Sequence, residues 1–113
     1  MLNRERLDAG LKVKADFLRA LSNPVRLAII EELQGGELPV GRMVERLSVE
    51  QSSLSKHLAI LRHAGLVVSR KRKSMVLYSI RNRAIFRVLR PIAQILRKRM
   101  AESRDIFAQL GRS

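Results

Sequence analysis

The sequence contains no cysteine and no tryptophan, and aromatic residues make up only 4% of its 113 residues. Without cysteine the chain can form neither a disulfide nor a thiolate metal site, and thiol-based redox sensing is excluded. Because hydrophobic residues still amount to 46%, the core must consist mainly of Leu, Ile, Val and Met. The three phenylalanines, Phe17, Phe86 and Phe107, are too scattered to form a surface on which unpaired bases would stack.

Long hydrophobic runs are also missing. No unbroken run of Ala, Val, Leu, Ile, Met and Phe exceeds four residues, which is far too short to span a bilayer. The N-terminal stretch MLNRERLDAGLKVK is charged throughout and has no apolar core of the kind found in secretion signals. We therefore expect a cytoplasmic protein that has no membrane partner.

Acidic residues are nearly absent from the second half of the chain. Residues 1–50 contain eight basic and eight acidic residues, whereas residues 51–113 contain fifteen basic and only two acidic residues. The whole net charge of +13 therefore lies in the second half, and this asymmetry indicates a polyanionic partner. A basic surface that only faces solvent is the alternative.

An enzyme is not expected. The sequence has no cysteine nucleophile, no glycine-rich loop for phosphates and no convincing acid–base pair in its basic half. Gly35-Gly36 is better interpreted as a helix terminus. The length allows a single domain over residues 1–113, and dimerisation would help a domain of this size to bury more surface.

Hydrophobic spacing predicts a mainly α fold with a small β-hairpin, in the order α-α-α-α-β-β-α. The expected helices cover residues 3–21, 24–34, 40–47, 51–64 and 82–110. Two strands, 66–69 and 75–80, should flank a long tip made of the basic tetrad and Ser74. The apolar positions expected to face inward on the first two helices are Leu7, Leu11, Phe17, Leu18, Leu21, Leu27, Ile30 and Leu33. Those on the fourth are Leu54, Leu58 and Leu61. Pro91 should kink or split the last helix.

The third and fourth helices have the size and spacing of a helix-turn-helix, whose second helix enters the major groove of DNA. Small polar residues at the start of that helix can contact base edges or phosphates. The candidates for the groove are Gln51, Ser52, Ser55, Lys56 and His57, and the candidates for the backbone are Ser53 and Arg62. His57 should be mostly neutral near pH 7. The alternative is that the serines only cap the helix.

A second basic feature is the tetrad Arg70-Lys71-Arg72-Lys73 between the two strands. Four adjacent cations repel one another, and an ordinary turn would favour Asn, Asp or Gly. Beside DNA they could each neutralise a phosphate and release counterions. We expect them to form a wing that contacts the DNA backbone, with a solvated hairpin tip as the alternative.

Three segments carry a resemblance to a known family: Leu21-Ser-Asn-Pro-Val-Arg-Leu27, Gln51-Ser-Ser-Leu-Ser-Lys-His-Leu58 and Leu61-Arg-His-Ala-Gly-Leu-Val67. In this order and spacing they resemble the winged-helix repressors of the ArsR/SmtB type. The resemblance implies a homodimer formed by the terminal helices, residues 3–21 and 82–110. It also implies a double-stranded, palindromic DNA operator and repression by blocking polymerase.

The departures from the family pattern concern its sensing sites. Where many members have two cysteines in the third-helix region, this chain reads Glu37-Leu-Pro-Val-Gly41, and its last helix has no histidine. The only histidines, His57 and His63, are spaced so that they do not share a helical face. We therefore expect no metal site and no cofactor.

Several alternatives remain open at this point. An unidentified small-molecule effector between the terminal helices is one, and a repressor without a ligand is another. Arg97-Lys98-Arg99 could extend the basic surface or bind an anionic effector, or could form a solvated face. Rival functions are a sequence-neutral architectural DNA binder and a winged-helix module that binds proteins rather than DNA.

Overall fold

The computed structural model describes the backbone of residues 4–110 and the side chains of residues 8–110. Within these residues it divides into two compact units, one that ends at Arg81 and one that begins at Asn82. The side chain of Leu7, which the sequence places on an apolar stripe, lies outside the described residues.

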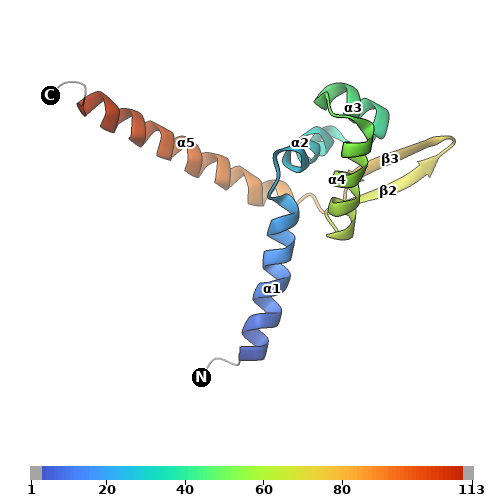
Figure 1. Cartoon of the computed structure of the whole chain (residues 1–113), viewed down its shortest axis with the longest axis horizontal. Helices are drawn as coiled ribbons and strands as arrows, with labels where there is room; N and C mark the ends of the chain where they lie inside the picture. Colours follow the sequence, from blue (N-terminus) through green and yellow to red (C-terminus); the bar gives the residue numbers. More distant parts are fainter. Residues whose placement is uncertain (1–3, 111–113) are drawn as a thin grey trace. The chain divides into compact units, whose positions relative to one another are not determined.

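Four helices and a small sheet make up the first unit (Figure 1). The helices are α1 (Arg4–Leu21), α2 (Pro24–Glu32), α3 (Val40–Leu47) and α4 (Gln51–His63). Asn23 caps α2 as predicted, because its side-chain oxygen accepts hydrogen bonds from the backbone of Val25 at 2.8 Å and of Arg26 at 3.1 Å. The helix ends at Glu32, earlier than predicted, and a 3-10 turn (Leu33–Gly35) continues it to Gly36.

The turn between α3 and α4 and the end of α4 both depend on left-handed backbone. Ser48 has a φ of 52° and returns its amide to the carbonyl of Val44. At the other end Gly65 has a φ of 77°, and the next amide, that of Leu66, donates to the carbonyl of Leu61 at 2.9 Å. A side chain at position 65 would strain this reversal, which directs the chain from α4 into the hairpin.

The core lies where α2, α3 and α4 meet the sheet. Its fully buried side chains are Ile29, Ile30, Leu33, Met43, Leu54, Leu58, Leu61 and Val67. The three leucines predicted on α4 are thus confirmed. The prediction for Leu27 is wrong, since its side chain is 36% exposed and Ile29 is buried instead. Each such aliphatic side chain contributes about 1.5–3 kcal/mol through its removal from water.

The sheet has three antiparallel strands rather than the predicted two. They are β1 (Leu38–Pro39), β2 (Val67–Arg72) and β3 (Met75–Ile80), in the order β1-β3-β2. The predicted long tip is wrong, because β2 continues through most of the basic tetrad and pairs Arg70 with Leu77 and Arg72 with Met75. Only Lys73 and Ser74 form the turn, and Lys73 takes a positive φ of 57° there.

The predicted apolar stripe of α1 is only partly buried. Leu21 and its neighbour Ala20 belong to the core of the first unit. Leu11, Phe17 and Leu18 are exposed, and Leu18 keeps 56% of its surface accessible. Within the first unit, therefore, α1 contributes its C-terminal end to the core, and the apolar residues of its middle stay uncovered.

The second unit consists of a turn and one helix, α5 (Ile85–Leu110). The helix begins three residues later than predicted, because Asn82 forms the preceding turn and accepts a hydrogen bond from the backbone of Ala84 at 2.9 Å. Pro91 lies inside a continuous helix, so the predicted split does not occur. Apolar side chains on α5 are exposed, among them Val88, Ile92, Ile95 and Leu96. No helix within residues 4–110 is both long and apolar enough to cross a membrane.

Candidate DNA-binding surface

Helix α4 separates its polar candidates from its apolar residues. Leu54, Leu58 and Leu61 have no accessible surface and fix the helix against the core. The other side carries five exposed candidates, namely Gln51, Ser52, Ser55, Lys56 and Arg62, while Ser53 and His57 are half-buried. The helical repeat therefore directs most polar side chains in the first two turns of α4 away from the core.

The serines at the start of α4 do not serve as its cap. The N-cap residue is Glu50, and its side chain makes no capping hydrogen bond. No acidic residue lies in the first turn itself, so Glu50 at the N-cap is the acidic residue beside the positive end of the helix dipole. Because the Glu50 side chain does not cap the helix, the backbone N–H groups of the first turn remain suitable donors for a phosphate oxygen or another anion.

The basic tetrad is divided between two faces of the hairpin rather than gathered at a tip. Side chains alternate along a strand, so Arg70 and Arg72 share one face of β2 and Lys71 lies on the other. Lys73 occupies the turn, and all four residues are exposed. The cations are therefore held by strand pairing, at a spacing of about 6.6 Å between Arg70 and Arg72 along the strand.

Arg70 is already engaged by an acidic residue. Its Nε donates to a carboxylate oxygen of Glu37 at 2.8 Å, and its Nη2 donates to the other oxygen of the same carboxylate. This hydrogen-bonded pair is the main cause that holds the pKa of Glu37 below its ordinary value of 4.5, and the charge of Arg72 adds to it. Lys71, Arg72 and Lys73, in contrast, form no ion pair within residues 8–110.

His57 is also in contact with a residue outside α4. Its Nδ1 lies 3.2 Å from Nη1 of Arg26, which belongs to the first turn of α2. Burial, and secondarily the charge of Arg26, lower the pKa of His57 below 6.5. The expectation of a neutral His57 is consistent with this environment, and the half-buried residue keeps part of its surface accessible.

Sequence reasoning missed both Glu37 and Arg26 as members of the site. Glu37 is 33 positions from Arg70, and Arg26 is 31 positions from His57. No periodicity within one helix or strand links residues that far apart. The sequence does place Arg26 in the first turn of a helix, because it follows Asn23-Pro24. That pattern gives no indication that its side chain would contact α4.

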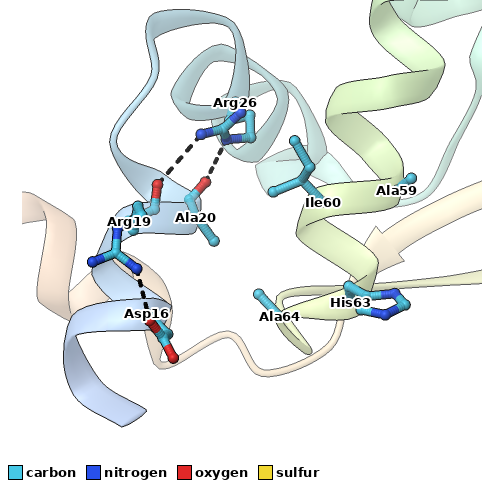
Figure 2. A pocket seen from close by; sticks show the side chains of 8 residues that line it. All are labelled: Asp16, Arg19, Ala20, Arg26, Ala59, Ile60, His63 and Ala64. Carbon is cyan, nitrogen blue, oxygen red and sulfur yellow. Dashed lines mark hydrogen bonds and ion pairs between the residues drawn. The ribbon is translucent and has the colours of Figure 1, made fainter. Parts of the chain in front are cut away.

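A groove of about 600 Å³ opens between the end of α1 and the second half of α4 (Figure 2). Its lining combines the apolar residues Ala20, Ala59, Ile60 and Ala64 with charged residues that include Arg19 and Asp16. None of the predicted DNA-contacting residues lines it. Among the side chains of residues 8–110, no three of His, Cys, Asp and Glu come together as a metal site.

Comparison with known proteins places this surface in a family. A family model described as a helix-turn-helix domain matches residues 21–70, which contain α2, α3, α4 and the start of β2. The HTH-type transcriptional regulator Rv0081 of Mycobacterium tuberculosis is 33% identical over 102 residues, covering 86% of this chain and 90% of that protein. The chain belongs to the ArsR/SmtB-type winged-helix transcriptional regulators.

Two other relatives of these regulators differ in the direction of their effect. The biofilm growth-associated repressor of Xylella fastidiosa is 32% identical over 79 residues, or 70% of this chain and 69% of that protein. The transcriptional activator HlyU of Vibrio cholerae is 38% identical over 79 residues, or 70% of this chain and 73% of that protein. Membership thus makes this chain a helix-turn-helix DNA-binding regulator of transcription.

Solved structures agree on the winged-helix fold. The crystal structure of Rv0081 superimposes with a TM-score of 0.75 at 31% identity, covering 81% of this chain and 93% of that one. The homodimeric winged helix-turn-helix DNA-binding domain of Mb0332 from Mycobacterium bovis gives a TM-score of 0.77 at 24% identity, covering 88% and 93%. In the terms of this fold, α3 and α4 are the helix-turn-helix and β2–β3 is the wing.

Proposed function

We propose that this regulator reads its operator with the exposed start of α4 and holds the DNA backbone with the cations of the wing. Gln51, Ser52, Ser55 and Lys56 contact base edges, with His57 beside them. Ser53, Arg62 and the wing residues Lys71, Arg72 and Lys73 contact phosphates. Arg70, the fourth wing residue, acts mainly through its pair with Glu37. The observation that best supports the reading role of α4 is the burial of its leucine face against the core, which leaves its polar residues exposed.

We further propose that the functional unit is a homodimer that binds an inverted repeat. The exposed apolar residues of α1 and α5 support it, since large apolar side chains such as Val13, at 69% exposure, and Ile95, at 61%, are costly to leave in water. A two-fold symmetric partner would cover the same surface on both chains. The two copies of α4 would then reach successive major grooves about one helical turn apart.

The proposed direction of regulation is repression. A dimer that covers an operator near a promoter excludes polymerase by occupying its site, which needs no further partner. The Xylella repressor supports this direction, whereas HlyU represents the opposite one. A reporter fused to the recovered operator would decide, because a repressor lowers the reporter signal when the regulator is expressed and an activator raises it.

The experiment that tests the function is selection of bound fragments from a random duplex library by the purified protein at about 0.15 M salt, close to physiological screening. An enriched inverted repeat with half-sites about 10 base pairs apart is the expected result. If the protein binds DNA but enriches no sequence, it does not read an operator and is instead a sequence-neutral architectural DNA binder. If the protein shows no salt-dependent binding to DNA, the remaining function is that of a winged-helix module that binds proteins.

A further inference from the structure

The side chain of Arg26 connects the end of α1 to the start of α2. Its Nε donates to the carbonyl of Ala20 at 2.6 Å, and its Nη2 donates to the carbonyl of Arg19 at 3.3 Å (Figure 2). Both carbonyls lie in the last turn of α1, where a helix leaves its oxygens without intrahelical donors. Arg26 thus acts as a side-chain cap for α1 while its backbone amide is held by Asn23.

The remaining nitrogen of the same guanidinium reaches the recognition helix. Nη1 of Arg26 lies 3.2 Å from Nδ1 of His57. A guanidinium can only donate hydrogen bonds, so Nδ1 has to offer its lone pair. The imidazole is then neutral, and its single hydrogen is carried by Nε2.

We propose that Arg26 is a positioning residue for DNA reading, which fixes the His57 ring in its neutral Nε2–H form and thereby provides α4 with an uncharged hydrogen-bond donor. This inference rests on the proposed function of α4. It assigns a role in specificity to a residue of α2 that lies outside the helix-turn-helix and outside the wing.

The physical reason concerns charge and orientation together. A protonated His57 would have a hydrogen on Nδ1, would lose its contact with Arg26 and would lie against another cation. Arg26, which approaches from α2, and Lys56, the neighbour of His57 on α4, are both positively charged, so the ring is better neutral in this place. A neutral donor can select acceptors such as N7 or O6 of guanine, whereas another cation would mainly strengthen contacts with any phosphate.

The first test needs no DNA. The chain contains only two histidines, His57 and the exposed His63, so long-range proton–nitrogen NMR spectra of the imidazoles report on each one. We expect His57 to show the Nε2–H tautomer and to have a pKa below the ordinary value of 6.5. In Arg26→Gln, the pKa of His57 should rise towards 6.5, because the nearby positive charge is gone.

Two further variants make this result specific. Arg42→Gln removes one positive charge from α3, where Arg42 pairs with Glu45, and should leave the tautomer and the titration of His57 as in the wild type. Arg26→Lys keeps the charge but loses the fork, so His57 should still titrate low while its tautomers become mixed. An Nδ1–H tautomer in the wild type, or a His57 that does not respond to Arg26→Gln in a folded protein, would overturn the proposal.

The second test concerns reading and uses the duplex enriched by the library selection together with a scrambled duplex of the same length. His57→Asn leaves an acceptor near the position of Nδ1 but removes the Nε2–H donor. We expect Arg26→Gln and His57→Asn each to lower the preference for the enriched duplex about fivefold to tenfold, as for one lost hydrogen bond. The double variant should lose little more than either single variant.

Additive losses in the double variant, or an unchanged preference in either single variant, would refute the coupling between Arg26 and DNA reading. Failure of the proposed function is distinguishable from this, because it would appear as a wild-type protein with no preference for any duplex. In that case the NMR experiment would still decide whether Arg26 fixes the ring of His57.

Discussion

Replacing Glu37 by glutamine should increase the number of phosphates that the wing neutralises. In the wild type the guanidinium of Arg70 is held by two hydrogen bonds to the Glu37 carboxylate, so its charge is compensated within the protein. Glutamine removes the negative charge and leaves a neutral amide that competes poorly with a phosphate for Arg70. If Arg70 reaches the DNA once released, the count of neutralised phosphates rises by one.

The size of the effect follows from counterion release. Each neutralised phosphate steepens the plot of log affinity against log salt by about 0.9 on duplex DNA. One additional contact therefore gives a further loss of affinity of about eightfold for a tenfold increase in salt. No stability change is needed for this result, because the Glu37–Arg70 pair is exposed and contributes little to folding.

The assay is fluorescence anisotropy with a labelled duplex of arbitrary sequence between about 0.05 and 0.5 M salt, so the operator need not be known. Glu45→Gln is the matched control, because it removes one exposed acidic charge that is paired with Arg42 on α3 at 3.6 Å. The wild type and Glu45→Gln should have equal slopes, and Glu37→Gln should be steeper. Equal slopes for all three proteins would refute the idea that Glu37 withholds Arg70 from DNA.

Four further predictions follow from the same structure. Arg72→Ala should flatten the salt slope by about 0.9 whereas Arg70→Ala should change it much less, and a larger effect of Arg70→Ala in the anisotropy assay would reverse the assignment. Gln51→Ala should lower the preference for the selected operator over scrambled DNA by about 1–3 kcal/mol without changing the salt slope, as competition binding would measure. Leu58→Ala should reduce the free energy of unfolding by about 2–5 kcal/mol in urea denaturation, because it removes buried side-chain volume from the core; a loss below 1 kcal/mol would contradict the packing of α4. Since the pKa of Glu37 is lowered from 4.5, its pair with Arg70 should be complete above that pH and be lost as the pH falls through the lower folded value; carboxyl-carbon NMR should find this titration shifted back towards 4.5 in Arg70→Ala.

The parts of the fold that follow a local repeat were predictable from the sequence. Leu54, Leu58 and Leu61 recur at helical spacing, and Gly65 ends their helix where it is expected. The inward face of α2 was harder to predict, because Leu27, Ile29 and Ile30 lie within one apolar run that allows more than one inward face. Packing against α3 and α4 selected Ile29 over Leu27.

The parts that depend on distant partners could not be predicted. Arg70 to Arg72 have little preference for a strand by themselves, and they are in one because β3 offers Met75 to Leu77 as partners. β1 has only two residues and no periodic pattern at all. The candidate DNA-binding residues remain predictions, whereas the contacts of Arg26 and Glu37 became visible only once α2, α4 and the sheet were assembled.

The pairing of β2 with β3 has a consequence for how wings of this kind can diverge. Because the turn holds only Lys73 and Ser74, the chain can be lengthened there without disturbing the ladder, and the cations below would keep their faces. A single residue inserted near Ser69 would instead move each following side chain of β2 to the opposite face of the strand. Lys71 would then stand where Arg70 and Arg72 stood, and the carboxylate of Glu37 would lose its guanidinium. One codon in β2 could therefore retune the affinity of the regulator for DNA without changing the charge of the protein.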